Sequence, residues 1–133
     1  MPFPKEPIPD IDTLFLRVHK VNVENINNIV KIMPYAFDPT PFENPDGLSV
    51  NWSKYSNAEV TKGEVLIFNK NPENYAVVSF NVNEVRNIPL GVEHHPTQNR
   101  AHSLIHNIPP RKANNSTIRM KLRNICKIEL NIG

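Results

Sequence analysis

Four of the five histidines of this 133-residue chain lie in one short segment, residues 84–106, and two arginines lie among them. The six residues are Arg86, His94, His95, Arg100, His102 and His106. Imidazole titrates near neutral pH, so a histidine cluster can relay protons, bind a metal ion or contact phosphate. The segment therefore contains the first candidates for a functional site, and its spacing alone does not choose among these uses.

The metal-binding interpretation is the easiest to test against the spacing. Neighbouring residues of a strand point to opposite faces, so at most one of His94 and His95 can join His102 and His106. The chain has a single cysteine and no His-Glu-x-x-His motif, and its four glycines form neither a P-loop nor a dinucleotide-binding fingerprint. We therefore predict no metal site and no bound cofactor.

A second interpretation is a metal-independent ribonuclease. Such an enzyme needs a general base, a general acid and a cation beside the phosphorane. His102 and a second histidine supply the first two types of group, and Arg86 or Arg100 supplies the third. Arg86 and His102 are therefore candidate catalytic residues, and Asn99 and Arg100 are candidate ligand-binding residues.

The charge distribution bears on the partner. Residues 1–99 contain 8 Lys and Arg against 12 Asp and Glu, a balance of −4, whereas residues 100–133 contain 7 against 1, a balance of +6. A basic C-terminal third could bind RNA or an acidic protein partner, with Arg119, Lys121 and Arg123 as candidate contacts. The alternative is an ordinary solvated helix whose basic residues suit its dipole.

The elements that position these residues follow from periodicity. Prolines at 2, 4, 7 and 9 predict an irregular arm over residues 1–13, and residues 14–133 form one domain. Leu14 to His19 alternates like a strand and places Arg17 and His19 on one face. Helical spacing over 23–33 predicts a helix, and the alternation over 47–52 predicts a strand with Ser49 and Asn51 facing away from the core.

The rest of the chain predicts more short elements. A capping box, Ser56-Asn-Ala-Glu59, begins a helix that runs to about Phe68. A buried strand covers 75–80 and extends toward Arg86. Further strands cover 92–95, 101–106 and 127–132, and a helix capped by Asn115 or Ser116 runs to about 124. The expected fold class is α+β, a mainly antiparallel sheet with two or three short helices.

Several short motifs resemble those of a loose group of small prokaryotic proteins with no established activity. The motifs are Ala36-Phe37, Leu48-Ser-Val50 and Asn99-Arg-Ala-His102, spread over residues 14–130. The resemblance singles out residues and implies no reaction. The abundance of Asn, Ile and Lys is typical of AT-rich coding sequence and indicates a bacterial source.

The order of Arg17 on a first strand and Ser49 on a later one is also similar to ADP-ribosyltransferase-like folds, including small RES-type toxins that consume NAD. In those folds a strand Arg or His grips the dinucleotide, and a Ser or Tyr supports the nicotinamide side. The resemblance implies such roles for Arg17 or His19, for Ser49 and for Glu84. The Gly-Arg-Trp/Phe-Asn type segment of the RES group is absent here.

The broadest hypothesis is a small binding or accessory module of a bacterial system, related to defence or to toxin–antitoxin pairs. The start of the chain lacks the pattern of a signal peptide, no apolar run is long enough for a membrane span, and one cysteine suits a reducing compartment, so a cytoplasmic location without membrane contact is expected. Whether the protein is an enzyme depends on geometry. Convergence of Arg17, Ser49, Arg86 and His102 in one concave pocket would favour catalysis.

Overall fold

The computed structural model describes residues 3–39, 47–109 and 117–133, and these residues have the α+β fold that the sequence predicts. Its centre is a six-stranded, fully antiparallel sheet with the strand order β6-β7-β4-β1-β5-β8. The strands are β1 (Thr13–His19), β4 (Leu48–Trp52), β5 (Tyr75–Asn81), β6 (Gly91–His94), β7 (His102–His106) and β8 (Lys127–Leu130). All six were anticipated from alternation and buried runs, with small differences at their ends.

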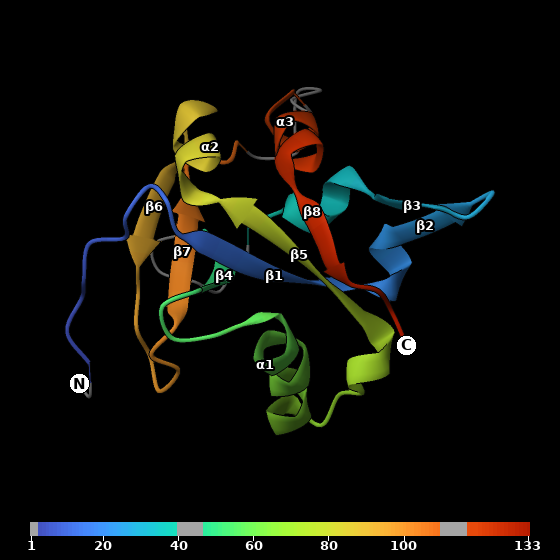
Figure 1. Ribbon diagram of the computed structural model, residues 1–133, viewed down its shortest axis with the longest axis horizontal. Coiled ribbons are helices and arrows are strands. Elements are labelled where there is room, and N and C mark those ends of the chain that lie inside the picture. Colours follow the sequence, from blue (N-terminus) through green and yellow to red (C-terminus); the bar gives the residue numbers. More distant parts are fainter. Residues whose placement is uncertain (1–2, 40–46, 110–116) are drawn as a thin grey trace.

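The two faces of the sheet have different characters because residues along each strand alternate between them. In β1 the pattern is strictly alternating, with Leu14, Leu16 and Val18 buried. These side chains belong to the main core with residues of α2 (Val82–Asn87), α3 (Thr117–Ile125) and the 3₁₀ helix η2 (Pro34–Phe37). Figure 1 shows α2 and α3 on one side of the sheet and α1 on the other.

The second face carries most of the polar side chains and is only partly covered. Its cover is α1 (Ala58–Gly63), which continues directly into the 3₁₀ helix η3 (Glu64–Phe68). The predicted helix over these residues is confirmed, but the predicted capping box is wrong. Asn57, one residue later than expected, is the N-cap and accepts a 2.8 Å hydrogen bond from Val60 N, while the Ser56 hydroxyl contacts Thr61 Oγ1 at 3.1 Å.

The helix predicted over 23–33 is wrong. The segment forms a hairpin of β2 (Val23–Ile26) and β3 (Ile29–Ile32), which projects from the sheet in Figure 1. Asn27 and Asn28 connect the strands with φ values of 52° and 65°. Asparagine tolerates this left-handed region, and two such residues form the tight turn that suits a hairpin. The left-handed conformation of the two asparagines and the β-branched residues favour a hairpin over the helix that the spacing predicted.

A second difference lies after β5. The strand does not extend toward Arg86, because Asn81 caps α2 by accepting a 3.1 Å hydrogen bond from Glu84 N. The predicted C-terminal helix is present as α3, whereas its predicted caps, Asn115 and Ser116, lie outside the described residues. The remaining 3₁₀ helices are η1 (Lys20–Asn22) and η4 (Pro72–Asn74).

The N-terminal arm is irregular from Phe3 onward and is fixed to the edge of the sheet. Lys5 bonds Glu93 of β6 at 2.6 Å, and Glu6 contacts Lys54, Tyr55 and Arg100. Hydrogen bonds from Lys54 and Tyr55 hold the pKa of Glu6 below its ordinary value. No helix in the described parts of the chain is long and apolar enough to cross a membrane.

Candidate functional site

A groove with a volume of about 970 Å³ opens on the polar face of the sheet. It lies over β1 and β4, beside α1 and η3, and it reaches the turn that precedes β7. Volumes of this size are typical of small-molecule sites, which combine apolar walls with a few polar groups. The polar residues that line it include Arg17, Ser49, Asn51, Thr61, Glu64, Asn99 and His102. Four of the sequence-predicted residues, Arg17, Ser49, Asn99 and His102, therefore share one concave site.

The first half of the site is an ion pair between β1 and η3. Arg17 Nη1 donates to Glu64 Oε1 at 3.0 Å and to the Thr61 carbonyl at 3.1 Å. The side chains retain 28% and 22% of their exposure, so both remain accessible from the groove. The alternation of β1 directs Arg17 away from the core, as predicted, and the turn into η3 brings Glu64 to it.

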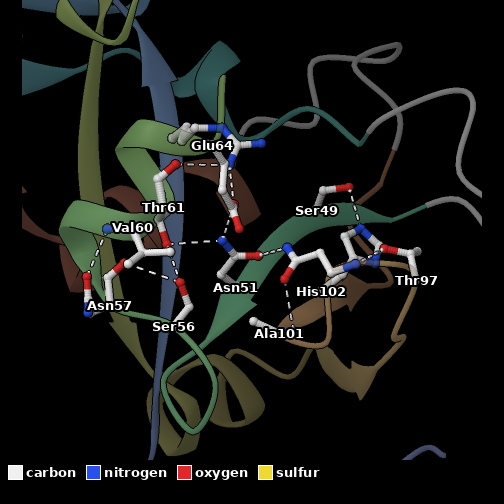
Figure 2. Close-up of polar contacts among 12 residues, drawn as sticks. Ser49, Asn51, Ser56, Asn57, Val60, Thr61, Glu64, Thr97, Ala101 and His102 are labelled. Carbon is white, nitrogen blue, oxygen red and sulfur yellow. Dashed lines mark hydrogen bonds and ion pairs between the residues drawn. The ribbon is translucent and has the colours of Figure 1, made fainter. Parts of the chain in front are cut away.

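Asn51 joins this ion pair to the rest of the site. Its Nδ2 donates to Glu64 Oε1 at 2.6 Å and to Thr61 Oγ1 at 3.0 Å, while its Oδ1 accepts from Asn99 Nδ2 at 2.9 Å. Asn99 in turn uses Oδ1 to accept from Ala101 N at 3.0 Å. Figure 2 shows Asn51 between Glu64 on one side and His102 with Ser49 on the other.

The second half of the site is a serine–histidine pair. His102 Nε2 lies 3.2 Å from Ser49 Oγ, and His102 Nδ1 lies 2.7 Å from the carbonyl oxygen of His95. A carbonyl oxygen only accepts hydrogen bonds, so the proton of the neutral imidazole belongs on Nδ1. Nε2 is then the acceptor, and the Ser49 hydroxyl donates to it. This arrangement orients His102 as a base toward Ser49.

The charges and the apolar rim describe the ligand that the groove suits. Two cations, Arg17 and Lys70, and two carboxylates, Asp38 and Glu64, line it. The apolar side chains at its edge include Ile67 and Phe68 of η3, which are 76% and 59% exposed. A groove of balanced charge with exposed apolar surface suits a compact, partly aromatic ligand better than an extended polyanion.

Several of the predicted residues are not brought to the groove, among them the two arginines of the ribonuclease hypothesis. Arg86 on α2 bonds Asp10 at 2.6 Å and the Ile8 carbonyl at 2.8 Å, which ties the N-terminal arm to α2. Arg100 lies over the Tyr55 ring, 4.3 Å from its centroid, and 3.7 Å from a Glu6 carboxylate oxygen. Both arginine side chains therefore contact the N-terminal arm. Glu84 is also outside the groove, exposed in the first turn of α2.

The basic residues of α3 do not form one surface. Arg119 is only 2% exposed and bonds Asp38 at 2.8 Å and the Pro109 carbonyl at 2.9 Å, so it cannot contact an external ligand as it stands. Lys121 is exposed beside a small hollow shared with α2, and Arg123 is half-buried. Burial raises the pKa of the Cys126 thiol, which disfavours the thiolate that a nucleophile would need.

The histidine cluster is divided among different environments. His94 is 2% exposed on the core face, where Nδ1 accepts from Glu6 N and Nε2 bonds the Arg100 carbonyl at 2.6 Å. His106 bonds Glu93 at 2.7 Å, and His19 caps η1. Only His95 accompanies His102, with their rings 5.3 Å apart. No group of three potential metal ligands occurs among the described residues.

Sequence reasoning missed Glu64, Thr61 and the central role of Asn51. A signal for Asn51 was present, since the alternation of the 47–52 strand places it on the same face as Ser49. Nothing in the sequence indicated that Glu64, on a separate helical segment, would meet Arg17. No family model matches the chain, and no curated protein or solved structure matches it either. We therefore infer the function of the groove from its geometry.

Proposed function

We propose that this protein is an enzyme that cleaves the bond between nicotinamide and ribose in NAD, with the groove as its active site. The observation that carries the proposal is the joint presence of the Arg17–Glu64 ion pair and the Ser49–His102 pair in one groove. The sequence resemblance to NAD-consuming folds required Arg17 and Ser49 to share a site, and they do. In this proposal Glu64 has the role that the sequence resemblance implied for Glu84.

The chemistry of the bond explains the choice of residues. When an N-glycosidic bond breaks, positive charge develops on the ribose, and a nearby carboxylate stabilises it. Glu64 is a carboxylate held in a fixed position by donors from Arg17 and Asn51. Nicotinamide is a good leaving group, so the site needs no strong acid on that side of the bond.

The other groups supply binding and base catalysis. His102 Nε2, as the acceptor of the Ser49 proton, is oriented to act as a general base. Arg17 and Lys70 are cations that can contact a pyrophosphate, and the exposed Phe68 offers a ring for stacking on a base. The groove volume is sufficient for a dinucleotide.

The ribonuclease hypothesis receives less support from the same geometry. Arg86 and Arg100 lie away from His102, and Arg119 is buried against Asp38. Among the described residues, two cations and two carboxylates line the groove, which is no excess of the positive charge that binding of an RNA backbone requires. The binding-module hypothesis stays a prediction and differs from our proposal in one respect, since a module would bind a ligand without changing it.

The test is incubation of the full chain with NAD, with chromatographic measurement of released nicotinamide. Glu64→Gln keeps the size and the hydrogen-bond acceptor but removes the charge, and we expect it to lower turnover by about 100-fold or more. Glu84→Gln is the matched control, because Glu84 is exposed on α2 outside the groove. Turnover with Glu84→Gln should equal that of the unmodified chain.

Three results would contradict the proposal. They are an absence of nicotinamide release by the unmodified chain, binding of NAD without cleavage, and equal losses in the Glu64→Gln and Glu84→Gln variants. Cleavage of an RNA substrate that depends on His102 would instead favour the ribonuclease hypothesis. Thermal unfolding of each variant distinguishes a lost reaction from a lost fold.

A further inference from the structure

The direction of the hydrogen bonds around Ser49 has a chemical consequence. His102 Nδ1 must donate to the His95 carbonyl, which lies 2.7 Å away, so in a neutral imidazole Nε2 is an acceptor for the Ser49 hydroxyl at 3.2 Å. A serine is activated as a nucleophile when a base accepts its proton and a third group orients that base. Here the third group is a main-chain carbonyl in the position that a carboxylate takes in the familiar serine–histidine–aspartate triad.

The comparison with other serines of the sheet shows that this arrangement is not a general property of its strands. Ser103 on β7 is fully buried and donates to the Ala101 carbonyl, and Ser79 on β5 donates to the Glu129 carboxylate. Neither bond gives its hydroxyl an imidazole acceptor. Ser49 combines an imidazole acceptor with a position on the wall of the groove.

We propose that Ser49 is the nucleophile of this site and forms a covalent bond with the substrate. The inference rests on the proposed function for the identity of the substrate, NAD, but not for the reactivity of the serine. Ser49 and Asn51 follow each other on one face of β4, about 7 Å apart. Asn51 holds Glu64, and both Ser49 and Glu64 line the groove, so a sugar bound there can contact the hydroxyl and the carboxylate.

The reaction proceeds in two balanced steps. In the first, Ser49 Oγ bonds C1′ of the ribose while the bond from C1′ to the nicotinamide nitrogen breaks. Its electron pair leaves with neutral nicotinamide, and the hydroxyl proton passes to His102 Nε2. In the second, water attacks C1′, the serine oxygen leaves and takes the proton from His102, and the proton lost by water enters the solvent. ADP-ribose is released and Ser49 is regenerated.

The first experiment uses a fluorophosphonate, which reacts with activated serines by forming an oxygen–phosphorus bond and releasing fluoride. We expect labelling of the full chain at Ser49, located by peptide mass spectrometry, and none in Ser49→Ala. His102→Asn keeps an N–H group near the position of Nδ1 but removes the base, and labelling should slow by about 100-fold. Ser79→Ala should label as fast as the unmodified chain, since Ser79 is bonded to Glu129.

His102→Gln provides a second variant if His102→Asn does not fold, because either one removes the imidazole base. Failure of Ser49 to label, or labelling that is unchanged in a folded His102 variant, would overturn the inference. Labelling that depends on His102 would support it.

The second experiment incubates the chain with NAD, quenches it with acid and analyses the peptide that contains Ser49. An ADP-ribosyl adduct on Ser49 supports both the nucleophile and the substrate. Nicotinamide release that persists in Ser49→Ala overturns the nucleophile and leaves the proposed function intact. Labelling of Ser49 by the fluorophosphonate without any NAD turnover overturns the proposed function and supports the nucleophile.

Discussion

Asn51 Nδ2 lies 2.6 Å from Glu64 Oε1, across 13 residues of sequence, and this contact joins the central strand β4 to η3. The same amide also bonds Thr61 and Asn99, so it connects strand, helix and turn at the floor of the groove. Asn51 is 4% exposed. The catalytic carboxylate that we propose is therefore positioned by a buried side chain whose two amide protons and carbonyl oxygen are all hydrogen-bonded.

Replacement of Asn51 should cost stability as well as activity. Asn51→Asp removes the Nδ2 donor and places a carboxylate against Glu64, so we expect the free energy of unfolding to fall by about 2–4 kcal/mol. Urea unfolding measures the change. Asn25→Asp on the exposed strand β2 is the control and should change stability by less than about 0.5 kcal/mol. Equal effects of the two substitutions would argue against the network.

The hairpin turn makes a prediction about backbone conformation. Asn28 has a φ of 65°, a region that β-branched residues strongly disfavour. Asn28→Val should therefore lower the free energy of unfolding by about 1–2 kcal/mol, whereas Asn28→Gly should preserve it. Thermal unfolding of both variants tests the ordering. Asn25→Val, at an exposed strand position of the same hairpin, should be neutral or stabilising.

Arg119 provides a test of the buried ion pair between α3 and the residue after η2. Arg119→Met leaves Asp38 without the guanidinium that lies 2.8 Å away. Loss of one member of a fully buried pair costs about 3–5 kcal/mol, and because the Asp38 side chain is 26% exposed we expect a smaller loss of about 2–3 kcal/mol. Lys121→Met, on the exposed side of α3, should have little effect. Equal losses in the free energy of unfolding of the two variants would show that the burial of Arg119 does not matter for stability.

The pH dependence of the arm contact follows from Glu93. Hydrogen bonds from Lys5 and then His106 hold the pKa of Glu93 below its ordinary value. A carboxylate with a lowered pKa in the folded state contributes stability above its ordinary pKa, and this contribution disappears as the pH falls through the lowered value. Because the group is one-third exposed, we expect less than about 1 kcal/mol.

Glu93→Gln should therefore reduce stability at neutral pH and leave it almost unchanged at the acid end of the titration. The measurement is urea unfolding of both proteins between neutral pH and about pH 3. A constant difference across this range would contradict the assignment to Glu93, since a pH-independent loss would come from packing.

Local patterns were sufficient for much of the fold. Alternation identified the strands over 14–19, 47–52 and 101–106, because a half-buried strand shows its two faces in its own sequence. The same alternation placed Arg17 on one face of its strand with His19, and Ser49 on the face of its strand away from the core. Helical spacing was misleading over 23–33, where Ile26, Ile29 and Val30 fit a helix but the turn at Asn27 and Asn28 produces a hairpin.

The site required information that no segment contains. The amino-acid sequence determined which strand side chains point away from the core, since successive side chains along a strand point to opposite faces. The strand order β7-β4-β1 and the packing of η3 on that sheet decided which of these side chains meet. Glu64 reaches Arg17 across 47 residues, and His102 reaches Ser49 across 53. Which strands and helices pack together depends on the apolar surface that the whole domain buries. Only the tertiary structure could therefore reveal these contacts.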